Sequence, residues 1–232
     1  MFDIIKKGTN MRITKEDLKN LIYRKPFAKR LSLMLIGVFI MGICVAFMRM
    51  CHLGTDPFSA INYGLVKYIP LSFGTLELIF NGILLILVVF NDISRLGWGT
   101  LGNMIIVGYT ADFVTFLMEK FFGITSLDVL PIRIAVMLAA VFVFVFAAAL
   151  YINAGLGSSA YDALPFVIHD KLCAKTHKNI PLKFVRMAFD AVFTALAFVL
   201  RGEAGIITVL MVLTLGPVID YVSKLLSSKL GL

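Results

Sequence analysis

Eight polar side chains interrupt apolar stretches of this sequence and could together bind a small solute. They are Asp56, Ser59, Glu77, Asn81, Ser159, Asp162, Arg186 and Asp190. A charge at the centre of a bilayer costs about 2.5–3.5 kcal/mol on insertion scales, so such groups normally face the interior of a helix bundle and mark a pathway. Carboxylate, amide, hydroxyl and guanidinium groups in one bundle would suit a small polar or anionic solute.

Two of these groups stand where helices are predicted to begin. Asp56 comes directly before a proline, and Ser159 holds a similar place later in the chain, with Asp162 three residues on. Asp and Ser are favoured N-caps, and an acid three residues later can complete a capping box. If such a start lies within the membrane, its free N–H groups can hold an anion or a carboxylate. The alternative is an ordinary cap at the membrane surface that contacts only water.

The remaining charged groups lie on two longer apolar segments. Glu77 and Asn81 are four residues apart and share a helix face, as do Arg186 and Asp190. We expect them to act as a gate, a counter-ion or a proton relay beside the solute. The alternative is an ion pair, within the second segment or between Glu77 and Arg186, that only fixes helix register.

In two further apolar segments a glycine stands four residues before an acid. This spacing leaves room for a neighbouring backbone on one helix face. An acid near a helix C-terminus is disfavoured by the helix dipole, so we expect it to have a partner or to contact water. With the glycines that precede the two predicted helix starts, the residues expected to have structural or gating roles are Gly54, Gly157, Gly108, Asp112, Gly216 and Asp220.

The elements that carry these groups must be membrane helices. Hydrophobic residues make up 59% of the 232 residues and charged residues 16%, with a mean hydropathy of +0.92. Soluble domains are about half apolar and about a quarter charged. We therefore exclude a water-soluble domain and predict an all-α fold, a polytopic transmembrane helix bundle.

Eight apolar segments can be distinguished along this bundle. Six approach the roughly 20 apolar residues that a helix needs to cross a bilayer: 31–50, 73–90, 98–118, 132–152, 182–200 and 205–225. Segments 56–69 and 159–168 are shorter, and each contains a proline. We predict that these two are half-helices or re-entrant pieces.

An internal repeat relates the two halves of the chain. Residues 53–60 align with 156–163 at an offset of 103, Glu77, Phe80 and Asn81 align with Arg186, Phe189 and Asp190 at 109, and Thr100, Gly108 and Asp112 align with Thr208, Gly216 and Asp220 at 108. We divide the chain into a basic N-terminal segment, 1–30, and two membrane repeats, 31–120 and 131–226. Eight crossings would make the halves parallel. Six crossings, with both short segments re-entrant, would make them inverted, and the shortness of these segments favours this arrangement.

The charge pattern bears on location and on partners. The net charge is +8, and residues 1–30 hold nine basic and three acidic residues beside the first apolar run. The positive-inside rule explains this placement and predicts cytoplasmic N- and C-termini. Because no groove-reading motif accompanies the basic residues, we expect no nucleic-acid partner. We find no phosphate loop, nucleophile–base pair or convincing metal motif, so we expect no enzyme activity, cofactor or metal.

Several motifs resemble the YczE/YyaS/YitT-type integral membrane proteins of bacteria. They are LGTDPF at 53–58, SFGT at 72–75, and GWGT at 97–100 leading to Gly108 and Asp112. The resemblance covers roughly residues 30–225 and implies a transporter-like protein of the plasma membrane whose function is poorly defined. The second half departs from the pattern, with Ser159 in place of the acid and Ala160 in place of the proline, so the halves need not contribute equally.

The sequence thus favours a permease for a small polar or anionic solute, with its site between two repeats. Such permeases are often built from internal repeats that bind solute near the bilayer midplane. The alternative is a non-transporting membrane partner or regulator, in which the basic segment docks a cytosolic or membrane partner. The lipid bilayer is an expected partner in both cases, and the sequence leaves open whether copies form a homo-oligomer.

Overall fold

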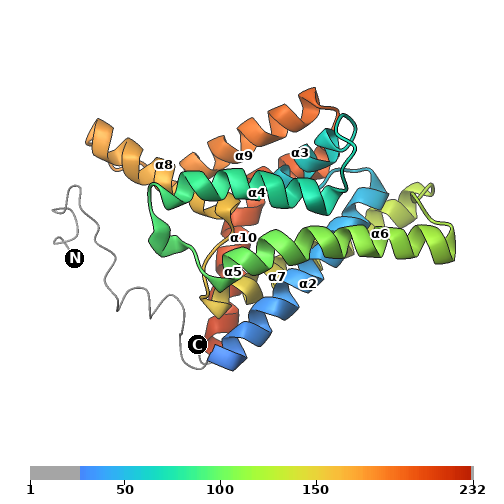
Figure 1. Cartoon of the computed structure of the whole chain (residues 1–232), viewed down its shortest axis with the longest axis horizontal. Coiled ribbons are helices and arrows are strands. Elements are labelled where there is room, and N and C mark those ends of the chain that lie inside the picture. Colours follow the sequence, from blue (N-terminus) through green and yellow to red (C-terminus); the bar gives the residue numbers. More distant parts are fainter. Residues whose placement is uncertain (1–26, 231–232) are drawn as a thin grey trace.

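The computed structural model describes residues 27–230 as an all-α bundle, which confirms the predicted fold class (Figure 1). The basic segment 1–30 lies mostly outside this range. In chain order the helices are α2 (Phe27–Cys51), α3 (Pro57–Leu65), α4 (Phe73–Val89), α5 (Trp98–Gly102), α6 (Gly108–Phe122), α7 (Leu130–Ala154), α8 (Ala160–Thr176), α9 (Leu182–Val199) and α10 (Ile206–Leu230). A 3-10 turn, η1 (Ile93–Arg95), precedes α5, and a π-helical stretch, η2 (Asn103–Val107), joins α5 to α6.

Four helical stretches in the described range are long and apolar enough to cross a membrane. They are α2, the continuous stretch Trp98–Phe122, α7, and Ile206–Ser228 of α10, with α4 as a shorter apolar helix. Large apolar side chains such as Phe39, Ile83 and Phe142 are exposed on the outside of these helices. Water would not tolerate so much exposed apolar surface, whereas lipid does. The chain is therefore a membrane protein.

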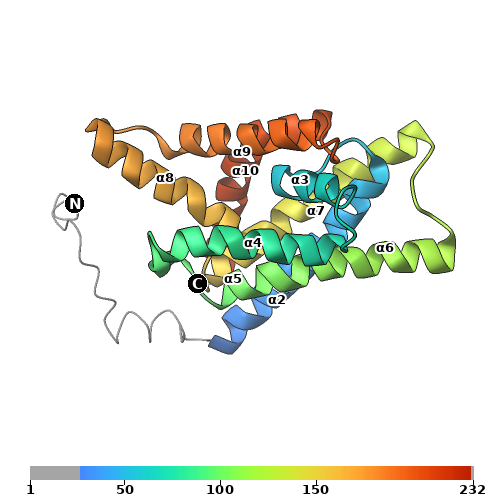
Figure 2. The same cartoon turned by 45° about the horizontal axis from the view of Figure 1, so that its top comes forward.

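The long helices α2 and α7 lie side by side through the centre of the bundle, in antiparallel directions (Figure 2). At one end, Nε of Arg133 in the first turn of α7 donates to the carbonyl of Cys51 at the end of α2, at 2.7 Å. At the other end, Nη1 of Arg30 donates to the carbonyl of Ala154, at 3.0 Å. Small residues allow the close approach, since a Cβ on Gly37 would lie 2.8 Å from the Ala147 carbonyl oxygen.

The other helices pack in reciprocal pairs around α2 and α7. The first half places α6 on α2, and the second half places α10 on α7. Across the halves, α3 contacts α9 and α8 contacts α4, so that α3 and α8 both lie between α4 and α9 (Figure 2). An apolar cluster that includes Phe58, Leu84, Leu164 and Phe193 fills the space among these four helices.

The loop before α3 and the loop before α8 each dock on the start of the last helix of the other half. Two backbone bonds hold each loop at equivalent places. They are Thr55 N–H to the Glu203 carbonyl (2.9 Å) and Ile207 N–H to the Leu53 carbonyl (3.1 Å), and Ser158 N–H to the Arg95 carbonyl (3.0 Å) and Gly99 N–H to the Leu156 carbonyl (2.7 Å). These bonds fix where α3 and α8 begin, well inside the bundle.

One predicted boundary is wrong. The sequence predicts a short segment that ends at residue 168, but α8 continues to Thr176. Its last turns carry exposed polar side chains, including Lys171 and Lys175. Hydropathy shows where a helix stops being apolar, whereas a helix in water continues for as long as its backbone bonds are satisfied. The end is set by His177, whose φ of +54° is left-handed.

Candidate functional site

A cavity of about 70 Å³ lies where the starts of α3 and α8 meet the central helices. By the usual measure of about 10–15 Å³ for one water-sized sphere, it has room for several waters or a small solute. The cavity is lined by seven of the eight residues that the sequence predicted for solute binding: Asp56, Ser59, Glu77, Ser159, Asp162, Arg186 and Asp190. Asn81 is fully buried one turn beyond Glu77 and does not line it.

Both helix starts have the caps predicted from the sequence. Oδ1 of Asp56 accepts from the Ser59 N–H at 3.0 Å, and Oγ of Ser159 accepts from the Asp162 N–H at 3.0 Å. The two capping residues share the same backbone conformation, with φ of −60° and ψ of 155°. The positive ends of the α3 and α8 dipoles are therefore directed at one cavity from two sides.

Arg186 forms a charged network with two acids on the second-half side of the cavity. Its Nη2 lies 2.8 Å from Oδ1 of Asp162, and its Nε lies 3.9 Å from Oδ2 of Asp190. The hydroxyl of Tyr161 donates to Asp190 at 2.5 Å, and that of Ser159 donates to Asp162 at 2.8 Å. The structure thus brings Arg186 and Asp190 together, as predicted, and adds Asp162 as the closer partner.

The first-half side of the cavity is built differently. The side chain of Glu77 is buried, with 2% exposed, and its Oε2 has no hydrogen-bond partner. Oδ2 of Asp56 and the hydroxyl of Tyr151, which also line the cavity, are buried and unpartnered too. The Glu77–Arg186 pair that the sequence allowed is not formed, because Arg186 binds the acids of its own half. Buried polar atoms are normally satisfied, so these three atoms lack the partners that buried groups usually have.

Aromatic rings enclose the cavity, and the sequence motifs for polar groups did not reveal them. Phe58 and Tyr161, on the first turns of α3 and α8, have ring centroids 4.9 Å apart. Tyr161 also packs on Phe189 at 5.0 Å, and Phe144 and Tyr151 of α7 line the cavity. The sequence did contain a signal for these rings, because Phe58 and Tyr161 occupy matching places in the aligned motifs at 53–60 and 156–163.

The helical stretch Trp98–Phe122 contributes to the cavity lining through its π-helical part. Asn103 and Val107, which bound the π-helical stretch η2, both line the cavity. A π-helical turn inserts one extra residue per turn and re-aims side chains, and such turns are frequent at functional sites. No pattern in the sequence marked this stretch.

The predicted structural glycines and acids divide into two groups. Gly108 packs tightly on α4, where a Cβ would lie 2.7 Å from Cα of Gly74, and Asp112 accepts from the Gly74 N–H at 2.8 Å. Their counterparts do not repeat this contact. The nearest atom to a Cβ on Gly216 would be Arg186 Cδ at 3.7 Å, and Asp220 is exposed. The expected close backbone approach at Gly216 is therefore wrong.

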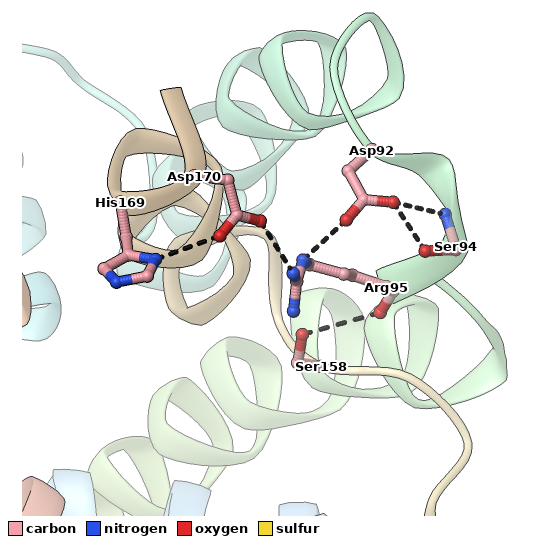
Figure 3. Close-up of polar contacts among 6 residues, drawn as sticks. All are labelled: Asp92, Ser94, Arg95, Ser158, His169 and Asp170. Carbon is pink, nitrogen blue, oxygen red and sulfur yellow. Dashed lines mark hydrogen bonds and ion pairs between the residues drawn. The ribbon is translucent and has the colours of Figure 1, made fainter. Parts of the chain in front are cut away.

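A second polar network lies outside the cavity, at the surface between the halves (Figure 3). Arg95 of η1 contacts Asp92 at 2.7 Å and Asp170 of α8 at 3.2 Å, and Asp170 also contacts His169 at 2.9 Å. A similar pair joins the halves elsewhere: His52, directly after α2, contacts Glu203, which precedes α10, at 3.1 Å. Exposed pairs of this kind add little stability.

Comparison with known proteins gives a family without an established function. The model of a family of unknown function, DUF6198, matches residues 28–224. An uncharacterized protein of Haemophilus influenzae is 26% identical over 199 residues, which cover 83% of each chain. The uncharacterized membrane protein YczE of Bacillus subtilis is 25% identical and covers 73% of each chain, and the uncharacterized protein YyaS of the same organism is 28% identical over 76% of this chain and 84% of its own. These matches confirm the resemblance drawn from the motifs, and no solved structure matches the chain significantly.

Proposed function

We propose that this chain, which belongs to the DUF6198 family, is a permease that carries a small polar solute through its central cavity. One observation carries the proposal. The helices α3 and α8 begin inside the bundle, and their first turns meet at a partly open cavity lined by residues with unpartnered polar atoms. Broken helices that end at a polar site between two halves are a recurring design of secondary transporters.

The two halves would be inverted repeats in this proposal. Three features support duplication: the identical cap geometries of Asp56 and Ser159, the reciprocal loop bonds, and the reciprocal packing of α3 on α9 and α8 on α4. The antiparallel packing of α2 against α7, the first long helices of the halves, supports inversion. Six crossings with α3 and α8 re-entrant follow from this arrangement.

The cavity is unequally exposed, which fits one state of an alternating-access cycle. The side chains of Arg186 and Asp162 are 25% and 31% exposed, whereas Glu77 on the opposite half is 2% exposed. Rocking of one half against the other would close the cavity beside Arg186 and Asp162 and open it beside Glu77. Together with the basic segment 1–30, the positive-inside rule would place the N- and C-termini in the cytoplasm, across a bacterial plasma membrane.

A cysteine in the cavity tests the permease without knowledge of the solute. Ser59→Cys would be made in a chain with Cys44, Cys51 and Cys173 replaced, and treated with an impermeant thiol reagent on right-side-out and on inside-out vesicles. A permease exposes the cavity to each side in turn, so we expect labelling in both preparations. Gly123→Cys, in the connection between α6 and α7, is the control and should be labelled in one preparation only.

Labelling of Ser59→Cys from one side alone would contradict the permease and favour the partner or regulator hypothesis, since docking needs no path through the membrane. Once a solute is found, Arg186→Ala should abolish its uptake and leave membrane insertion intact. Normal uptake by that variant would remove Arg186 from the transport pathway.

A further inference from the structure

The charges that line the cavity are mostly negative. Four carboxyl groups line it, those of Asp56, Glu77, Asp162 and Asp190, against the single guanidinium of Arg186. Arg186 already contacts two of the four. An anionic solute would therefore meet no unpaired cationic side chain among the described lining residues, and it would lie beside the two acids that Arg186 leaves unneutralised.

Those two acids lie in the first half of the chain and each has a free oxygen. Oε2 of Glu77 and Oδ2 of Asp56 are both buried without a hydrogen-bond partner, and both residues line the same cavity. The Asp56 cap uses only its other oxygen. A buried carboxylate is strongly disfavoured unless a positive group or hydrogen-bond donors compensate it. Apart from the positive end of the α3 dipole, which Asp56 already caps, this arm of the cavity lacks a positive partner, and a solute can supply one.

We propose that the solute is a small organic cation, whose ammonium group binds between Asp56 and Glu77. This inference rests on the proposed permease and names its solute class. The rings of Phe58, Phe144, Tyr151 and Tyr161 line the same cavity, and aromatic faces attract ammonium ions as well as apolar groups. The Tyr151 hydroxyl, also unpartnered, is an additional acceptor for an N–H group.

The lining suits an organic cation better than a metal ion. Calcium takes six to eight oxygen ligands, and magnesium takes about six in a near-octahedral arrangement. Within residues 27–230, no group of three or more His, Cys, Asp or Glu side chains is placed to hold a metal ion. The cavity has room for several waters, and this size favours a solute with few heavy atoms, such as methylammonium or ethylammonium.

Equilibrium binding to the purified full-length protein in detergent tests the solute class directly. Radiolabelled methylammonium is the probe, measured by scintillation proximity. We expect saturable binding that unlabelled ethylammonium displaces and that equal concentrations of sodium chloride or sodium propionate leave unchanged. Absence of saturable binding, or displacement by sodium as effective as by ethylammonium, would overturn the inference in favour of an inorganic ion or a different solute.

Two acid-to-amide variants locate the site. Glu77→Gln should weaken methylammonium binding at least about tenfold, because a charged acceptor is replaced by a neutral one. Asp56→Asn should also weaken binding and keeps the helix start, since asparagine is an equally good N-cap. Glu119→Gln, an identical change at an exposed position of α6, is the matched control and should bind like the wild type.

Unchanged binding by both cavity variants would overturn the assignment to Asp56 and Glu77. If one variant proved unstable during purification, unchanged binding by the other would overturn it. The result is also separable from the permease itself. If methylammonium binds but Ser59→Cys is labelled from one side only, the cation site stands and transport fails. If labelling is two-sided but methylammonium does not bind, transport stands and the solute class is wrong.

Discussion

Gly54 and Gly157 have the same unusual backbone conformation, with φ of +114° and +101°, at matching places before α3 and α8. Each is pressed against the opposite half of the chain. A Cβ on Gly54 would lie 2.5 Å from Oγ1 of Thr208, and a Cβ on Gly157 would lie 2.5 Å from the backbone nitrogen of Gly97. These glycines allow both loops to turn back into the bundle and to start a helix at the cavity.

The first prediction concerns this turn. Gly157→Ala should lower the free energy of unfolding by roughly 1–3 kcal/mol, because alanine disfavours positive φ and its Cβ would clash with backbone. The midpoint of thermal unfolding in detergent would report the loss. Gly82→Ala is the control: Gly82 lies within α4 with open space around its Cβ position, so alanine there should be neutral or slightly stabilising. Equal midpoints for the two variants would contradict the account of the turn.

The second prediction separates two glycines that the sequence treats as equivalent. Gly108→Ala should destabilise the protein, since its Cβ would lie 2.7 Å from Gly74 Cα and would force α4 and α6 apart. Gly216→Ala should be tolerated, because its nearest neighbour is in ordinary van der Waals contact at 3.7 Å. The same thermal assay checks both. A larger loss at Gly216 than at Gly108 would show that the packing of these helices is misdescribed.

The third prediction is an energetic coupling between Arg186 and Asp162. Removing either partner takes an opposite charge away from the other in a partly buried site. Removing both adds no further unpaired charge, because the loss of a partner for Asp190 is already present in the Arg186→Met variant. A double-mutant cycle with Arg186→Met and Asp162→Asn should therefore give a coupling of about 1–3 kcal/mol in unfolding by mixed detergent micelles.

The surface pair of Arg95 and Asp170 provides the comparison for that cycle. Its side chains are 30% and 59% exposed, so the same cycle there should give a coupling below about 1 kcal/mol. A coupling at Arg95 equal to that at Arg186 would mean that the cavity network is no more enclosed than the surface.

Local sequence signals predicted the parts of the site that depend on neighbouring residues. The caps at Asp56 and Ser159 depend on residues three positions away, and the Arg186–Asp190 contact joins positions one helical turn apart. Each of these could be inferred from spacing alone. The membrane class followed from composition, since apolar runs of this length match the thickness of a bilayer core.

Contacts between distant helices could not be predicted in this way. Asp162 and Arg186 lie on different helices, and the packing of α8 against α9 decides that they meet. The same packing leaves Glu77 unpaired, although the sequence allowed it to meet Arg186. Nor did loop charge distinguish parallel from inverted halves, because the connection between α6 and α7 is nearly neutral.

The central claim is that α3 and α8 begin inside the membrane between two halves of opposite orientation. Topology labelling tests it most directly, with single cysteines at Gly123 and Asn153 in a chain lacking the native three and an impermeant thiol reagent on intact cells. Gly123 follows α6 at the end of the bundle where α7 begins, and Asn153 lies at the opposite end of α7. We predict that Gly123→Cys is labelled from outside and that Asn153→Cys is labelled only after permeabilisation. The reverse pattern would mean eight crossings and parallel halves, with Asp56 and Ser159 as ordinary caps near one membrane surface.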